Sequence, residues 1–89
     1  MMPIQDLLNR IRWDEQFAQG KEFVVGYYDR VSNRVVKVPF DRLHLEKGEH
    51  FGFDALEADG SVHSIPFHRV RDVWRDGELI WHRNYATGS

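Results

Sequence analysis

The chain contains no cysteine, and this absence removes disulfide bonds, thiolate catalysis and cysteine-ligated zinc from consideration. Long apolar runs are missing as well, so no segment is long enough to cross a bilayer as a helix. Residues 1–6 show no basic segment followed by an apolar stretch, which a secretory leader would have. We therefore expect a soluble, cytoplasmic protein with no membrane partner.

The sequence also lacks an excess of positive charge. Its 12 Lys and Arg residues are outnumbered by 14 Asp and Glu residues, which gives a formal net charge of −2. Proteins that bind long nucleic acids indiscriminately usually carry a basic surface, so we expect no such binding and no DNA partner. A compact site for one phosphate group needs only a few well-placed arginines, so the negative net charge does not exclude such a site.

What the sequence does contain is enough apolar material for one core. Hydrophobic residues make up 42% and aromatic residues 13% of the 89 positions, which is typical of a small globular domain. We find no linker, internal repeat or low-complexity segment. We predict one domain over residues 1–83 and a frayed tail over residues 84–89.

The first regular pattern is an apolar stripe at helical spacing. Ile4, Leu7, Leu8 and Ile11 stand at i, i+3, i+4 and i+7, which is one face of an α-helix. Pro3 suits the start of that helix. Burying each aliphatic side chain contributes about 1.5–3 kcal/mol as an upper value, so we predict that this face packs on the core.

Most of the remaining sequence has the composition of short strands separated by turns. We predict strands over residues 23–28, 35–38, 51–55, 62–67, 70–74 and 79–81. Residues 39–45 are interpreted as a helical turn or an irregular crossing, which Lys47-Gly48-Glu49 closes. The predicted fold class is α+β, with an N-terminal helix packed on a curved antiparallel sheet of five or six short strands.

Alternation assigns two faces to the first strand. One face carries Phe23, Val25 and Tyr27, and the other carries Val24, Gly26, Tyr28 and Arg30. The second face therefore holds a tyrosine and an arginine near a strand end. The glycine beside them permits close approach by another chain or a ligand.

The last hairpin admits two registers around Asp76-Gly77. A two-residue loop pairs Arg75 with Glu78, whereas a type I turn with a glycine bulge pairs Trp74 with Glu78. We favour the bulge, which aligns Val73 with Leu79 and puts Trp81 on their face, beside Arg71 and Arg83. Trp74 is expected to be a core residue.

The five histidines do not form a recognised catalytic or metal motif. No two of them stand at i, i+4 on the predicted helix, and no carboxylate completes a ligand set. We expect no metal and no cofactor. None has Ser or Thr two residues later, as two-histidine phosphodiesterases require. Phosphate-binding Walker loops and nucleophile elbows are also absent.

The densest functional pattern is Ile65-Pro66-Phe67-His68-Arg69-Val70. Pro66 holds Ile65 extended, so an imidazole and a guanidinium follow a stiff apolar anchor and could grip an anion. The alternative is that His68 caps a local group while Arg69 is a surface charge. Aromatic residues suited to stacking and arginines suited to phosphate stand at predicted strand ends: Tyr28, Trp81, Arg30, Arg69 and Arg83. This mixture suits the end of a single-stranded RNA.

Four blocks of the sequence, taken in order, resemble one family. They are Leu8-Asn9-Arg10-Ile11-Arg12-Trp13-Asp14, Tyr27-Tyr28-Asp29-Arg30, the block from Ile65 to Val70, and Asp76-Gly77-Glu78-Leu79-Ile80-Trp81-His82-Arg83. Their order is similar to that in the RNA cyclic group end recognition domain family, and the likeness covers nearly the whole chain. Glu15 stands where many relatives place a proline, which we expect to change the helix exit and not the site.

The resemblance implies a small α+β domain, found alone or fused to RNA-end enzymes, that is thought to recognise RNA ends bearing a 2′,3′-cyclic phosphate. The basic and polar positions of the matching blocks are Arg10, Arg30, His68, Arg69 and Arg83. With Tyr28 and Trp81, these residues make up the predicted RNA and phosphate site.

Three functions follow as hypotheses. The leading one is a non-enzymatic module of RNA processing or repair that binds an RNA 3′ end or a nucleotide phosphate and partners RNA-processing enzymes. The second is a cyclic phosphodiesterase or ribonuclease-like enzyme with His68 as acid or base. The third is a protein-interaction module, which should expose an apolar patch on its sheet.

Overall fold

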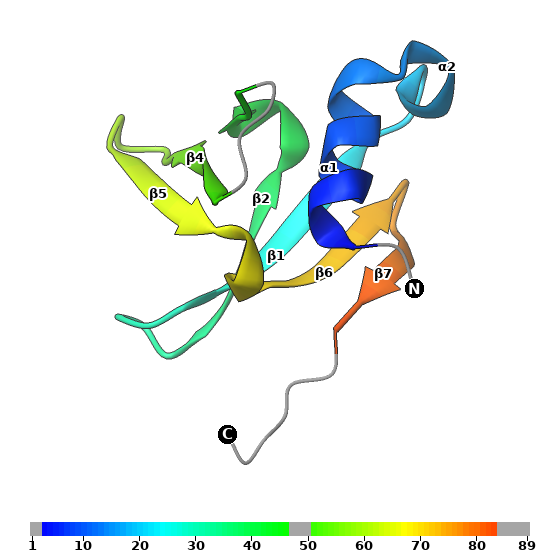
Figure 1. Cartoon of the computed structure of the whole chain (residues 1–89). Helices are drawn as coiled ribbons and strands as arrows, with labels where there is room; N and C mark the ends of the chain where they lie inside the picture. Colours follow the sequence, from blue (N-terminus) through cyan, green and yellow to red (C-terminus); the bar gives the residue numbers. More distant parts are fainter. Residues whose placement is uncertain (1–2, 47–50, 84–89) are drawn as a thin grey trace.

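The apolar stripe near the N-terminus forms helix α1 (Ile4–Trp13), and all four residues of the stripe are buried. The computed structural model describes residues 3–46 and 51–83 (Figure 1). The expected turn at 47–49 and the expected tail at 84–89 lie outside the described residues. No helix in the described ranges is both long and apolar enough to cross a membrane.

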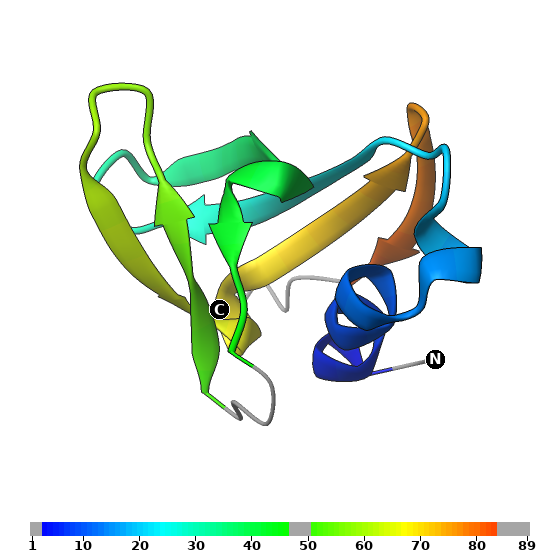
Figure 2. The same cartoon turned by 90° about the horizontal axis from the view of Figure 1, so that it is seen from above.

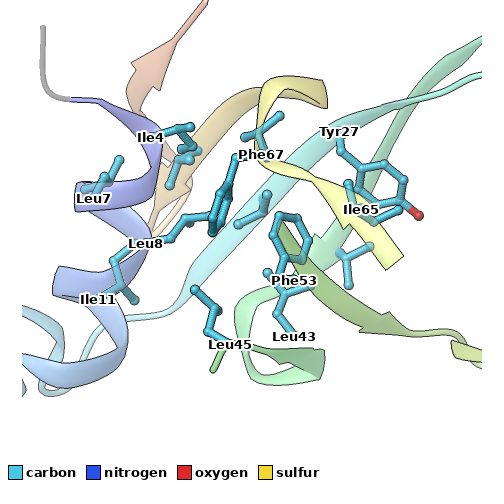
Figure 3. Packing of buried hydrophobic residues seen from close by; sticks show 14 of the residues in the cluster. Ile4, Leu7, Leu8, Ile11, Tyr27, Leu43, Leu45, Phe53, Ile65 and Phe67 are labelled. Carbon is cyan, nitrogen blue, oxygen red and sulfur yellow. The ribbon is translucent and has the colours of Figure 1, made fainter. Parts of the chain in front are cut away.

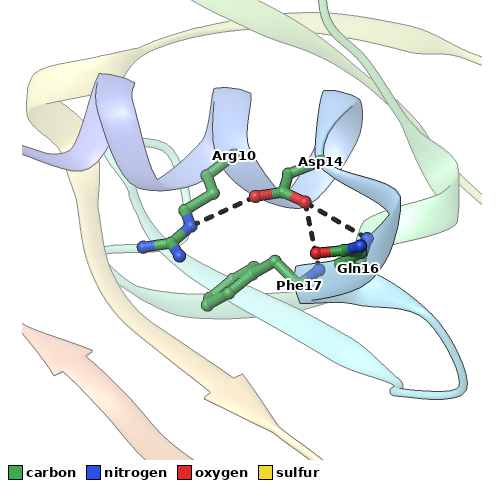
Figure 4. Close-up of polar contacts among 4 residues, drawn as sticks. All are labelled: Arg10, Asp14, Gln16 and Phe17. Carbon is green, nitrogen blue, oxygen red and sulfur yellow. Dashed lines mark hydrogen bonds and ion pairs between the residues drawn. The ribbon is translucent and has the colours of Figure 1, made fainter.

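A short second helix, α2 (Glu15–Ala18), follows α1 directly, and Asp14 caps it. One carboxylate oxygen of Asp14 accepts hydrogen bonds from the backbone N–H groups of Gln16 at 3.1 Å and Phe17 at 3.3 Å (Figure 4). Capping of this kind satisfies donors that the first helical turn leaves without partners. The chain thus turns sharply after α1, with Glu15 as the first residue of α2.

The described residues form seven strands, which divide into two antiparallel sheets. The larger sheet has the order β2-β1-β6-β7 and the smaller one β3-β4-β5. The strands are β1 (Phe23–Asp29), β2 (Arg34–Pro39), β3 (Leu43–His44), β4 (Gly52–Leu56), β5 (Val62–Pro66), β6 (Val70–Arg75) and β7 (Glu78–His82). The α+β class with its N-terminal helix is confirmed, while the strands form two sheets where the sequence indicated one.

Two crossings between the sheets explain this division. Each begins at a proline that ends a strand, and each continues as a three-residue 3-10 helix: η1 (Phe40–Arg42) after Pro39 and η2 (Phe67–Arg69) after Pro66. Proline has no N–H for the strand ladder, so pairing stops there and the chain changes sheet. Both crossings read Pro-Phe-x-Arg.

The last hairpin adopts the register that the sequence analysis placed second. Arg75 pairs with Glu78 across a two-residue turn in which Asp76 has φ 50° and Gly77 has φ 84°. Two left-handed residues are the requirement of a type I′ turn, whose twist matches that of the flanking strands. The preference for a bulge at Gly77 was therefore wrong.

A bulge occurs further along the same hairpin. Val73 pairs with Trp81 and Trp74 pairs with Leu79, which leaves Ile80 as an extra residue on β7. This extra residue turns the side chain of Trp81 inward, where it is 6% exposed. The expected pairing of Val73 with Leu79 is absent, but Val73 and Trp81 do share a face.

Helix α1 and the smaller sheet lie on the same side of the larger sheet (Figure 2). Their apolar side chains meet in one core, which Figure 3 shows from close by. The largest of the fully buried side chains are Leu8, Val25, Val70 and Val73. These come from α1, β1 and β6, so the larger sheet and the N-terminal helix hold the centre of the fold.

The opposite face of the larger sheet, called the outer face below, is not covered by any other helix or strand in the described ranges (Figure 2). Register and alternation place on it Val24, Gly26, Tyr28, Val35, Lys37, Asp72, Trp74, Leu79 and His82. Trp74 thus lies outside the buried core, contrary to expectation, while Trp81 lies inside it. The environments of the two tryptophans are therefore the reverse of those predicted.

Candidate nucleic-acid interface

Two arginine side chains converge on a single backbone carbonyl at the end of the larger sheet. The Nη1 atoms of Arg71 and Arg83 donate hydrogen bonds to the carbonyl oxygen of His68 at 2.9 Å and 2.8 Å. The backbone N–H of Arg83 also donates to the carbonyl of Arg71 at 2.9 Å. Main-chain and side-chain contacts therefore fix these two residues, the arginine pair, next to each other.

The position of Arg71 results from a second β-bulge. Gly26 of β1 pairs with Asp72 and Tyr27 pairs with Val70, so Arg71 is an extra residue on β6. A bulge bends the strand and redirects the side chain of the extra residue. Here the guanidinium carbon of Arg71 lies 5.9 Å from the centre of the Tyr28 ring, on the outer face.

Like charges oppose each other within the pair. The pKa of Arg83 is lowered first by partial burial and then by the positive charge of Arg71. An anion placed between the guanidinium groups would relieve this repulsion and would meet planar N–H donors suited to phosphate oxygens. The arrangement is thus suited to a small anion.

Aromatic rings flank the pair on two sides. The guanidinium carbon of Arg83 lies 5.1 Å from the centre of the Trp81 ring, and Arg71 faces Tyr28. Because Trp81 belongs to the core, it supports Arg83 and does not present a ring face for stacking. Tyr28, whose hydroxyl donates to the side-chain oxygen of Asn33, is half-buried on the outer face. The arginine site is defined here as Tyr28, Arg71, Arg83 and the carbonyl of His68.

The structure brings some of the predicted site residues together and leaves others apart. Tyr28 and Arg83 belong to the arginine site, and Trp81 contacts Arg83 from the core. His68 and Arg69 stand on η2, where His68 is exposed and Arg69 half-buried. At the arginine site the backbone carbonyl of His68, and not its imidazole, makes the contacts.

Arg30 and Arg10 occupy other surroundings. Arg30 is exposed in the turn that follows β1. Arg10 lies at the junction of the two helices, with its Nε 3.6 Å from a carboxylate oxygen of Asp14 and its guanidinium carbon 4.5 Å from the centre of the Phe17 ring (Figure 4). These contacts connect α1 to α2 and involve no residue of the arginine site.

A separate pocket of about 490 Å³ lies against the smaller sheet. His68 lines it together with His44, Glu46 and Asp54. The Nε2 atom of His44 is 3.0 Å from a carboxylate oxygen of Glu46. Two carboxylates make this pocket less suited to phosphate than the arginine site. Among the described residues, no group of three or more His, Asp or Glu side chains could hold a metal ion.

Sequence reasoning missed two residues of these sites. Arg71 was noted beside Trp81 but was not included in the predicted site, because the bulge that redirects it leaves no clear local signal. His44 was not connected to His68, since the two are brought together by pairing of β3 with β4 and of β4 with β5.

The fold and the arginine site define a small α+β domain equipped to hold an anion. The chain belongs to the family described as the MJ1316 RNA cyclic group end recognition domain, whose model matches residues 1–83. A protein of Metallosphaera sedula described as a UPF0248 protein is 32% identical over 82 residues, which are 92% of this chain and 94% of that relative. No solved structure matches. The resemblance inferred from the sequence blocks is confirmed, and the family's description points to RNA ends as the ligand.

Proposed function

We propose that this protein is a non-catalytic module that binds the phosphorylated 3′ end of an RNA at the arginine site, with 2′,3′-cyclic phosphate as its ligand. The observation that carries the proposal is the convergence of Arg71 and Arg83 on the His68 carbonyl. Two guanidinium groups held together offer several N–H donors to the non-bridging oxygens of one phosphate.

The tyrosine ring supplies the rest of the recognition. A cyclic phosphate carries one negative charge, whereas a linear terminal phosphate carries about 1.5–2 at neutral pH, so charge alone would favour the linear form. Preference for the cyclic form must come from contact with the ribose and its base, and the ring of Tyr28 is placed beside Arg71 for such contact. Arg30 and Arg69 are proposed as additional phosphate contacts on the turns adjoining the site.

Binding should be measured by fluorescence anisotropy with three RNAs of one sequence that end in cyclic phosphate, linear phosphate or hydroxyl. We expect both phosphorylated ends to bind more tightly than the hydroxyl end, and the cyclic end most tightly. Arg83→Ala should weaken binding of the cyclic end by about 1.5–3 kcal/mol, the contribution of a charge-assisted hydrogen bond.

The matched control is Arg42→Ala, because Arg42 is an exposed arginine on η1. It removes the same charge and should leave the affinity unchanged. Equal affinity for the three ends would contradict the proposal, as would equal effects of the two substitutions. Melting temperatures of both variants verify that each is folded.

A second candidate function is an enzyme acting on the cyclic phosphate, and the observation favouring it is that His44 and His68 line one pocket. Such a pair could serve as acid and base. His68→Ala separates the two candidates, because alanine keeps the backbone carbonyl that holds the arginine pair but removes the imidazole from the pocket. Binding that survives this substitution supports the module. Turnover by the wild type that disappears in both His68→Ala and His44→Ala supports the enzyme.

The wider setting follows from the proposed ligand. RNA ends with cyclic phosphate are substrates of processing and repair enzymes, so we propose such enzymes as partners. We propose the cytoplasm as the location, because a reducing compartment suits a cysteine-free chain. Because the end group forms on a ribose 2′-hydroxyl, DNA is not a ligand. Pull-down of the tagged protein from cells, with and without RNase treatment, would show whether partners bind directly or through RNA.

A further inference from the structure

We infer that the outer face of the larger sheet binds the single-stranded RNA next to the recognised end, with a base stacked on Trp74 and a phosphate held by Lys37. This inference rests on the proposed function, since it places the strand that leads away from the arginine site. Nothing in the family's description assigns this surface.

Trp74 is an aromatic platform on an uncovered face. A Cβ added to Gly26 would lie 3.0 Å from the Cζ3 atom and 3.2 Å from the Cη2 atom of this indole. The absence of a side chain at Gly26 therefore lets the ring lie close to the backbone of β1. The close approach predicted at this glycine does occur, although the group that approaches is the indole.

A cation accompanies the indole. The Nζ atom of Lys37, which pairs with Gly26 across β1 and β2, lies 4.6 Å from the centre of the Trp74 ring. Lysine is a flexible point charge, so its ammonium group can leave the ring when a base stacks there and can bind the adjoining phosphate. A ring for the base and a cation for the backbone are the two parts of a single-strand site.

The surface is continuous with the arginine site. Gly26, under the indole, and Tyr28, beside Arg71, are two residues apart on the same face of β1, a separation of about 7 Å along a strand. The indole of Trp74, which lies over Gly26 from β6, and the ring of Tyr28 on β1 thus follow one another along the outer face, leading away from the arginine pair. RNA-binding sheets commonly stack successive bases on aromatic residues in this manner.

The charges of the face also favour RNA over a protein partner. Lys37 and Arg71 contribute positive charge, while the carboxylate of Asp72 is contacted by Nδ1 of His82 at 2.7 Å. Among the exposed large apolar side chains of the described residues, those on this face are Val35 of β2 and Leu79 of β7, on either side of Trp74 and Lys37. Cations interleaved with aromatic rings are suited to a polyanion with stackable bases.

The test compares two ligands with the same end: a nucleoside 2′,3′-cyclic monophosphate and a five-nucleotide RNA that ends in cyclic phosphate. We expect the longer ligand to bind more tightly to the wild type. Trp74→Ala should remove that gain, about 5- to 150-fold for one stacked base, and leave the affinity for the mononucleotide unchanged. Isothermal titration calorimetry measures both ligands without a label.

Three controls sharpen the result. Trp13→Ala removes a tryptophan of α1 that is 49% exposed and should not alter either affinity. A pentamer with abasic positions before the end should lose the same gain on the wild type. Lys37→Ala should reduce the slope of log affinity against log salt concentration by about 1 for the pentamer.

The outcomes distinguish the two proposals. Failure of both ligands to bind would overturn the proposed function. Equal affinity of the wild type for both ligands would overturn the inference alone, as would a length-dependent gain that persists in Trp74→Ala. Loss of mononucleotide affinity in Trp74→Ala would also overturn it, because the indole would then belong to the end site.

Discussion

Substituting alanine for each of the two tryptophans on the last hairpin should destabilise the protein to very different extents. Trp81 is 6% exposed and belongs to the core, and truncating a buried aromatic residue costs about 3–5 kcal/mol. A domain of this size has a free energy of unfolding of about 5–13 kcal/mol. Trp81→Ala therefore removes a large part of it and should lower the melting temperature by at least about 12 °C. Trp74→Ala, on the outer face, loses the contact with Lys37 and the packing of a half-buried indole over Gly26, and it should cost less, about 1–2 kcal/mol.

Urea denaturation followed by far-ultraviolet circular dichroism measures both variants without relying on tryptophan fluorescence. Trp81→Phe and Trp74→Phe serve as matched controls, since each keeps an aromatic ring of smaller size. Trp81→Phe should recover part of the lost stability. Equal destabilisation by the two alanine substitutions, or a larger effect of Trp74→Ala, would refute the register in which Ile80 is the extra residue of β7.

Three further substitutions test other parts of the fold. Gly52→Ala should destabilise the protein by about 2 kcal/mol or more in urea denaturation, because the new Cβ would overlap the carbonyl of Ile65 on the paired strand. The pKa of Tyr27 is raised to about 12, first by burial and then by the carboxylate of Glu57. The folded state therefore keeps the Tyr27 proton at pH values where the unfolded chain, with a pKa near 10, has lost it. The stability that Tyr27 contributes is complete below pH 10 and is lost as the pH rises through 12. Tyr27→Phe should therefore reduce the fall of the urea midpoint between pH 9 and 12. Asp14→Ala removes the cap of α2 and should lower the free energy of unfolding by about 0.5–2 kcal/mol, and an unchanged urea midpoint would argue against the cap.

The elements that follow from the sequence are those that depend on local periodicity. Ile4, Leu7, Leu8 and Ile11 can share a face only in a helix, and all four are buried. The alternation of β1 is equally informative, since Phe23, Val25 and Tyr27 are buried together. In each case the apolar face has one way to leave water, so the pattern determines both the element and its orientation.

Faces next to a bulge do not follow from periodicity. One extra residue exchanges the two faces of a strand, and Ile80 does so for Trp81. Both tryptophans carry the same local preference, so only the long-range pairing of β6 with β7 decides which one is buried. The same reason explains the omission of Arg71, whose direction depends on pairing of β6 with β1.

The division into two sheets had a sequence signal that was not used. The pattern Pro-Phe-x-Arg occurs at residues 39–42 and again at 66–69. At both places a proline ends a strand and a phenylalanine turns toward the core. One such crossing can be a local irregularity, whereas two with the same chemistry indicate that the chain leaves one sheet and later returns to it.

The crossing at η2 also explains why the arginine site can be ready before a ligand arrives. Pro66 ends the pairing of β5, and Phe67 anchors the turn with 6% exposure. The carbonyl of His68 consequently stands outside the strand ladders and can accept from both arginines. Its partial negative charge offsets part of their repulsion, and the two bonds restrict side chains that would otherwise lose considerable freedom on binding. That entropy is lost on folding, so a phosphate meets guanidinium groups that are already in place.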